Sequence, residues 1–210
     1  MYGLCNVNEW QNGGGLAEFA MTKENITVAR PSKLSANKVV GLPIGRLMAH
    51  QAITQSGGVK LDGSGKKKTN ILITAAFGGV GHYAVQLAKL GNTHVTATCG
   101  ARNIELVKNL GANKVLNYKT PDVAALRSPS GIKYDAVIHC ATSIPWWSTF
   151  ETNWSPNGKV IDITPGPSAL VTFALKKLTF SKKQLAPLKL IPKSENLQYL
   201  VNLVRESSRQ

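Results

Sequence analysis

The feature that most constrains the fold of this chain is a glycine-rich turn at 75–81, which reads Ala-Ala-Phe-Gly-Gly-Val-Gly. It follows a short apolar run at 70–74 and precedes a segment at 80–90 in which apolar residues recur at helical spacing. The run before the turn shows no polar alternation and contains β-branched residues, which is typical of a buried parallel strand. The sequence therefore predicts a strand, a turn and a helix in direct succession.

A turn of this kind lets a backbone approach a phosphate, because the helix that follows presents free N–H groups and a partial positive charge to an anion. The spacing of Ala75, Gly78 and Gly81 is three residues and then three, whereas the usual dinucleotide fingerprint steps by two and then three. A tight strand-to-helix turn in any α/β protein has similar glycines. The turn by itself therefore leaves both interpretations open.

From residue 70 onward, expected strands alternate with expected helices. The strands are expected at 70–75, 94–98, 114–117, 134–139, 158–163 and 186–191, and the helices at 80–90, 102–110, 121–127, 146–152, 168–180 and 194–205. This alternation predicts an α/β fold, a Rossmann doubly wound parallel sheet of about six strands, with a ligand where the strand order reverses. Residues 1–50 contain too few strands to enclose a core of their own.

The end of the second expected strand bears on the choice of cofactor. A protein that binds NAD usually places a carboxylate about 20 residues after the glycine turn, but Cys99, Gly100 and Arg102 follow this strand and no carboxylate does. A guanidinium binds a 2′-phosphate well, which favours NADPH over NADH. The alternative is that Arg102 is a solvated residue of the next helix, where a cation near the N-terminus is mildly unfavourable without an anion.

The formal net charge of +14 favours anionic partners, whether a phosphorylated cofactor, a lipid surface or a nucleic acid. Lysines concentrate at 66–68 and again between 176 and 193, where no acidic residue occurs. No aromatic residues alternate with these lysines, which argues against a nucleic-acid platform. A solvated face is the other interpretation of such a run.

Cysteines and histidines form no recognisable reactive set. Cys5, Cys99 and Cys140 lie far apart and have no metal-binding spacing, which indicates a reducing compartment. We expect no membrane-spanning helix and no secretory signal. His82 is interpreted as a packing residue or a neighbour of the phosphate, and His139 as buried scaffolding.

Several segments together resemble one protein family. The zinc-free quinone oxidoreductases of the medium-chain dehydrogenase/reductase superfamily have similar sequences at 13–20, 41–44, 75–90 and 110–118. Plant chloroplast envelope quinone oxidoreductase-like proteins also resemble the chain at 96–103, 159–167 and 181–188. The resemblance extends from about residue 13 to residue 205 and is far more specific than the turn alone.

The resemblance implies an NADPH-dependent oxidoreductase that reduces enones, ketol-type lipid derivatives or quinones by hydride transfer without zinc. Nine cofactor contacts carry over to this sequence. The phosphate contacts fall on Gly78, Gly79 and Val80, with Gly81 as a further cofactor contact beside them. The adenosine-phosphate contacts fall on Gly100, Arg102 and Tyr118, and the nicotinamide side on Ala141 and Thr164. The resemblance assigns no catalytic side chain and no metal ligand. Tyr118 has a second interpretation, as an ordinary aromatic strand residue.

The resemblance also implies two domains, with 1–50 as the last part of a GroES-like catalytic lobe and 51–210 as the NADP-binding Rossmann domain. The substrate site of the family lies between the two lobes, so we expect half of it to be missing from this chain. An alternative function is therefore a catalytically incomplete NADP-binding remnant. Another is a basic module that binds an anionic membrane surface or nucleic acid. A homodimer is a further possibility for the assembly of the chain.

The resemblance places the protein at the chloroplast envelope as a peripheral membrane protein, and the lysines at 176–193 are compatible with an anionic lipid surface. A reducing soluble compartment is the other expectation.

One residue departs from the family pattern. Phe77 stands where relatives commonly have a serine whose hydroxyl helps to bind the diphosphate.

Overall fold

The computed structural model describes residues 2–3, 18–19, 21–32, 35–36, 40–65, 69–120, 127–141, 152–166, 171, 173–175, 178 and 184–207. The chain divides into two compact units. One comprises Met1–Leu47 together with Leu190–Gln210, and the other comprises Met48–Lys189.

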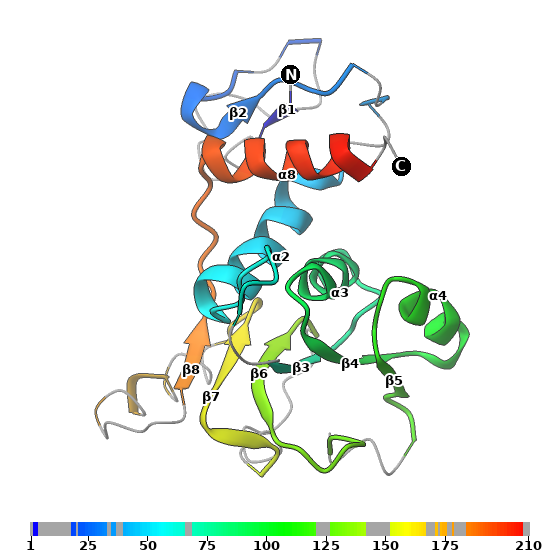
Figure 1. Cartoon of the computed structure of the whole chain (residues 1–210). Coiled ribbons are helices and arrows are strands. Elements are labelled where there is room, and N and C mark those ends of the chain that lie inside the picture. Colours follow the sequence, from blue (N-terminus) through cyan, green and yellow to red (C-terminus); the bar gives the residue numbers. More distant parts are fainter. Residues whose placement is uncertain are drawn as a thin grey trace. The chain divides into compact units, whose positions relative to one another are not determined.

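The larger unit is built on a parallel sheet that has six strands in the described part of the chain (Figure 1). The strands are β3 (Asn70–Ile73), β4 (His94–Cys99), β5 (Lys114–Asn117), β6 (Tyr134–His139), β7 (Trp154–Asp162) and β8 (Gln184–Pro187). Their order is β5-β4-β3-β6-β7-β8, and each neighbouring pair is parallel. The order reverses between β3 and β6, which confirms the predicted Rossmann doubly wound sheet.

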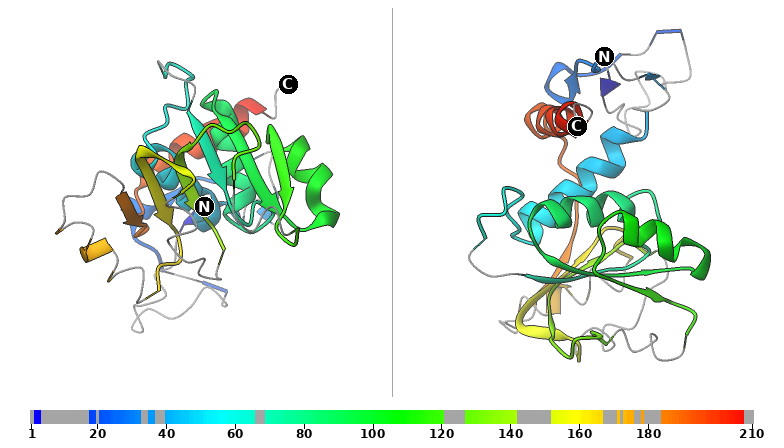
Figure 2. Two further views of the ribbon diagram at one scale, coloured as in Figure 1. Left: turned by 90° about the horizontal axis from the view of Figure 1, so that it is seen from below. Right: turned by 45° about the vertical axis from the view of Figure 1, so that its right-hand side comes forward.

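Two helices of this unit lie on the same face of the sheet, as Figures 1 and 2 show. They are α3 (Gly81–Leu90) and α4 (Ile104–Asn109), and a 3₁₀ turn, η4 (Ala101–Asn103), precedes α4. The apolar stripe of α3 is buried, as its spacing predicts. Its members are Ala84, Val85, Leu87 and Ala88.

The central strands carry a row of buried apolar side chains in register. Leu72 pairs with Val137, Val137 pairs with Val160, and Val160 pairs with Leu185. All four side chains are buried in one cluster that also contains Tyr134 and Trp154. Burying an aliphatic side chain of this size stabilises a fold by about 1.5–3 kcal/mol, so this row fixes the register of the strands.

Some predicted boundaries differ from those in the structure. β7 starts at Trp154, earlier than predicted, and β8 covers 184–187 instead of 186–191, because it pairs with 159–162 of β7. The predicted helices at 121–127 and 146–152 lie almost wholly outside the described residues. Residues 171, 173–175 and 178 are helical, as predicted.

The smaller unit combines segments from both ends of the chain. A two-stranded antiparallel sheet forms from β1 (Tyr2–Gly3) and β2 (Thr27–Val28), next to the 3₁₀ turn η1 (Glu24–Ile26). The helix α8 (Ser194–Ser207) packs against η1 and β2. The side chains buried in this unit include Ile26, Val28, Leu197, Leu200 and Val201.

A helical stretch runs from η2 (Leu42–Arg46) through α2 (Leu47–Gln51) to η3 (Ala52–Ser56), in which η2 and η3 are π-helical turns.

The contacts place α8 in the same unit as the N-terminal segment, whereas the domain boundary predicted from the sequence places it in 51–210. The identities of the two predicted domains, 1–50 and 51–210, remain predictions. Among the described residues, no helix is both long and apolar enough to cross a bilayer.

Candidate functional site

The glycine-rich turn leaves the end of β3 and is fastened to the neighbouring strand. The backbone of Ala75 has a left-handed φ of 47°, and the N–H of Gly78 donates to the carbonyl of Ala75 at 2.8 Å. Two further bonds reach β4, where Thr98 accepts from Ala75 N–H at its hydroxyl (3.3 Å) and from Ala76 N–H at its carbonyl (2.9 Å). The turn is therefore bonded within itself and to β4.

Two glycines of the turn have opposite surroundings. A Cβ at Gly81 would lie 2.4 Å from the carbonyl oxygen of Ala75 and 2.8 Å from the Cα of Ala76, so only glycine lets α3 start this close to the turn. A Cβ at Gly79 would meet nothing within 4 Å. The first position is needed for packing, whereas the second faces open space.

The start of α3 presents unpaired donors. In the described part of the chain, the backbone N–H groups of Gly79, Val80 and Gly81 make no hydrogen bond. Consecutive N–H groups at a helix N-terminus form a concave site for an anion, and the helix dipole adds favourable potential. The predicted cofactor contacts at 78–81 thus include three donors that have no partner among the residues that the structure describes.

A second set of predicted residues meets at the ends of β4 and β5. The N–H of Tyr118 donates to the carbonyl of Cys99 at 3.2 Å, and a Cβ at Gly100 would lie 3.7 Å from Cε1 of the Tyr118 ring. The Tyr118 ring is 57% exposed. Arg102 lies in η4 with an exposed side chain, and no described residue forms an ion pair or hydrogen bond with its guanidinium.

The nearest acidic residue in the sequence after this corner is Glu105, whose carboxylate forms an ion pair with Lys108 at 2.8 Å. No carboxylate precedes Arg102 in β4 or η4. The corner formed by Gly100, Arg102 and Tyr118 therefore combines an exposed cation with an exposed aromatic ring.

The strand ends at the reversal of strand order are joined by buried polar groups. The Thr74 hydroxyl lies 2.9 Å from Nδ1 of His139 and accepts the N–H of Cys140 at 3.0 Å. Thr74 and His139 are both buried, so His139 is scaffolding, as predicted. These bonds connect the ends of β3 and β6.

Ala141 and Thr164, the two residues predicted on the nicotinamide side, are brought together at the ends of β6 and β7. The Thr164 hydroxyl donates to the Ala141 carbonyl at 3.2 Å, and the Thr164 N–H donates to Oδ1 of Asp162 at 3.0 Å. Together with the turn and the Tyr118 corner, they place all nine predicted residues at the carboxyl edge of the sheet. A dinucleotide crosses this edge in Rossmann folds.

The sequence did not predict the hydrogen bonds that three residues make at this edge. Thr74 and Thr98 join strand ends, and His82 bonds the turn with its imidazole. A polar residue directly after a buried strand is a weak signal that could have pointed to the two threonines. Phe77, which replaces the expected hydroxyl, is 47% exposed.

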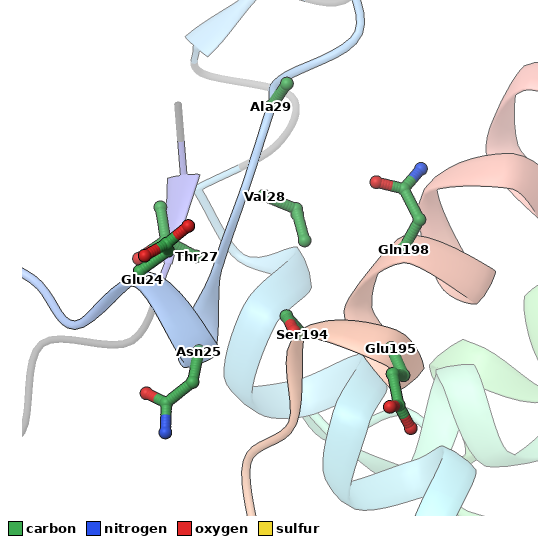
Figure 3. A pocket seen from close by; sticks show the side chains of 8 residues that line it. All are labelled: Glu24, Asn25, Thr27, Val28, Ala29, Ser194, Glu195 and Gln198. Atoms are coloured by element: carbon green, nitrogen blue, oxygen red, sulfur yellow. The ribbon is translucent and has the colours of Figure 1, made fainter.

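The smaller unit contains an open hollow of about 830 Å³ (Figure 3). Side chains from η1 and β2 line one side, and side chains from the first turns of α8 line the other; they are Glu24, Asn25, Thr27, Val28, Ala29, Ser194, Glu195 and Gln198. None of the predicted cofactor contacts lies there. Within the described ranges, no group of three or more histidine, cysteine or acidic side chains is placed to hold a metal ion.

The strand order and the parallel pairing define a Rossmann-type protein. The family model described as "Zinc-binding dehydrogenase" matches residues 79–203. The chain belongs to this family, among the quinone oxidoreductase-like proteins of the medium-chain dehydrogenase/reductase superfamily, which confirms the resemblance seen in the sequence.

Two plant proteins illustrate the relationship. The "Quinone-oxidoreductase homolog, chloroplastic" of Spinacia oleracea is 69% identical over 194 residues, and the "Chloroplast envelope quinone oxidoreductase homolog" of Arabidopsis thaliana is 67% identical over 194 residues. In both cases the match covers 92% of this chain and 58% of the relative. The chain thus spans less than two thirds of the length of these relatives.

Solved structures show the same fold. The quinone oxidoreductase of Coxiella burnetii is 30% identical with a TM-score of 0.72, and the match covers 86% of this chain and 52% of that one. An NAD-dependent alcohol dehydrogenase shares the fold at 23% identity, with a TM-score of 0.72, and the match covers 89% of this chain and 53% of that one.

The contrast between the two glycines generates a first prediction. Gly81→Ala should destabilise the protein by about 2 kcal/mol or more, because its Cβ would collide with backbone atoms. Gly79→Ala is the matched control and should change the free energy of unfolding by less than about 0.5 kcal/mol. Urea denaturation followed by circular dichroism measures both, and equal midpoints for the two variants would contradict the packing role of Gly81.

A second prediction concerns pH. Burial, with a contribution from Asp162, raises the pKa of the Cys140 thiol to about 12 from a usual value of 9.0. Between these values the unfolded chain releases this proton while the folded chain keeps it, so the thiol lowers the free energy of unfolding as the pH rises above 9. Between pH 8 and pH 10.5 the parent should lose up to about 2 kcal/mol more than Cys140→Ala. Urea titrations at both pH values test this, and identical losses would refute it.

Proposed function

We propose that the protein is an NADPH-dependent oxidoreductase that reduces enones, ketol-type lipid derivatives or quinones. The observation that carries the proposal is the meeting, at one edge of the sheet, of three unpaired backbone donors and the corner that holds Arg102. The two plant relatives are named as quinone oxidoreductase homologues, which supports quinones as a substrate class. One of them is named as a chloroplast envelope protein, which supports the envelope as the proposed location.

The N–H groups of Gly79, Val80 and Gly81 are proposed to donate to the diphosphate of the cofactor. The open space beside Gly79 fits the close approach of a phosphate, because no atom of the described residues lies within 4 Å of the position where a Cβ would be. The start of α3 adds a favourable potential for the negative charge. Gly78 is proposed to shape this site through its bond to Ala75.

Arg102 is proposed to bind the 2′-phosphate that distinguishes NADPH from NADH. Its guanidinium is exposed, and no described residue occupies its donors. Tyr118 lies over Gly100 and offers an aromatic surface to the adenosine. The lack of a carboxylate in β4 and η4 removes both the repulsion of a 2′-phosphate and the usual acceptor for the ribose of NAD.

The ends of β6 and β7 are proposed to line the nicotinamide. The bond between Thr164 and Ala141 fixes the two strand ends relative to each other. The Thr74 hydroxyl fixes the Cys140 backbone by accepting a hydrogen bond from its N–H. When bound, the cofactor supplies a hydride to the activated double bond or quinone, in a reaction that we propose needs no zinc. In this proposal 1–50 is part of a GroES-like lobe and 51–210 is the NADP-binding domain.

The proposal predicts that the chain binds NADPH more tightly than NADH, and that Arg102→Ala removes the difference. Loss of a charge-assisted contact to the phosphate should weaken NADPH binding by about tenfold or more and leave NADH unchanged. Fluorescence titration of both cofactors measures this, with Arg127→Ala as a matched exposed control. Equal affinities for the two cofactors in the parent chain would remove the argument for NADPH.

An assay of NADPH oxidation with a panel of enones and quinones separates the enzyme from its main alternative. Turnover supports a complete reductase. Binding of NADPH without turnover instead supports a cofactor-binding remnant.

A second candidate function, attachment to an anionic membrane surface, is favoured by a specific observation. Apolar side chains of the helical residues Val171, Leu175 and Leu178 are 60%, 57% and 75% exposed. Lysines stand next to them in the sequence at 176–177 and 182–183. Apolar side chains flanked by lysines bind lipid surfaces through both burial and charge.

This candidate predicts that the chain sediments with vesicles of phosphatidylglycerol and not with vesicles of phosphatidylcholine, and that salt weakens binding. Leu178→Asp should reduce the bound fraction several-fold, whereas Leu106→Asp, on an exposed side chain of α4, should not. Binding that is indifferent to ionic strength would contradict an electrostatic origin. Equal binding to duplex DNA would favour the nucleic-acid alternative instead.

A further inference from the structure

The carbonyl of Gly78 is held by one residue from two directions. The backbone N–H of His82 donates to it at 3.2 Å, and Nδ1 of the His82 imidazole lies 2.7 Å from it. A carbonyl oxygen can only accept, so the imidazole must carry a hydrogen on Nδ1 and donate it. The side chain of His82 therefore binds the backbone of the glycine turn.

This bond decides where the next donor points. In a trans peptide unit, the carbonyl of one residue and the N–H of the following residue point in opposite directions. The described chain contains no cis peptide bond. Holding the Gly78 carbonyl toward α3 therefore directs the N–H of Gly79 away from His82. Gly79 is the first of the three unpaired donors and faces open space.

The peptide unit between Gly78 and Gly79 needs such a restraint. Glycine adopts many backbone conformations, so a unit between two glycines can rotate at little cost. In the rotated form the Gly78 carbonyl would take the place of the Gly79 N–H. The bound anion would then meet a partial negative charge and not a donor. The His82 imidazole is itself restrained, because its ring centroid lies 3.8 Å from that of Tyr83.

We propose that His82 is a positioning residue for the diphosphate of the cofactor, acting through the Gly78–Gly79 peptide unit. The inference rests on the proposed function, because it takes the three unpaired donors as the diphosphate site. His82 touches neither the substrate nor the reacting atoms in this proposal. Its contribution is to keep a donor, and not an acceptor, directed at the phosphate.

The test compares two substitutions at this position. Asparagine also carries a nitrogen donor on Cγ, so His82→Asn retains the bond to the Gly78 carbonyl, whereas His82→Leu has similar bulk and no donor. Two ligands are titrated by fluorescence or NMR. NADPH contains the diphosphate, and adenosine 2′-monophosphate contains only the part assigned to Arg102 and Tyr118.

We expect His82→Leu to weaken NADPH binding about five- to tenfold, as the loss of one aligned donor implies, and to leave adenosine 2′-monophosphate unchanged. His82→Asn should bind NADPH within about twofold of the parent. His94→Leu, at the start of β4, is a control that should alter neither ligand. Arg102→Ala should instead weaken both ligands, because both contain the 2′-phosphate.

Three results would overturn the inference. Unchanged NADPH affinity in His82→Leu would show that the peptide unit needs no restraint, while the proposed function would stand. Equal losses for both ligands would show that His82 acts through general stability. If the parent chain binds neither ligand, the proposed function fails together with the inference.

Discussion

The close approach of α3 to the turn that precedes it is the contact on which the rest of the candidate site depends. The first residue of the helix lies against the backbone of Ala75 and Ala76, in a space that no side chain could share. The N–H groups of Gly79, Val80 and Gly81, at the end of the turn and the start of the helix, have no hydrogen-bond partner among the described residues. This contact explains the glycine at 81, and the three donors beside it are the proposed diphosphate site.

The parallel sheet gives that turn its neighbours. Parallel strands bring their carboxyl ends to one edge, so residues far apart in sequence, such as Gly100, Tyr118 and Thr164, lie along a single edge of the sheet. Hydrogen bonds between strand ends then hold this edge together, with Thr98 bonded to the turn and Thr74 bonded to the backbone after β6. The buried row that begins at Leu72 sets the register that these bonds require.

Much of this fold could be predicted from the sequence because its signals are local. The apolar runs of the central strands and the apolar spacing of α3 gave correct positions within a few residues. The ends of β7 and β8 were less accurate, since strand length is set by the partner strand and not by the strand's own residues. The packing of α8 against Ile26 and Val28 was missed for a similar reason, because an amphipathic helix does not specify which surface it covers.

The sequence by itself determined the order of the elements, the position of the glycine turn and the missing carboxylate before Arg102, because each depends on residue type and spacing along the chain. Only the tertiary structure decided which donors remain unpaired, how Thr74 reaches His139, and that His82 bonds the Gly78 carbonyl. Those facts depend on the directions of groups in space. A hydrogen bond needs a distance and an angle that no pattern of residues can supply.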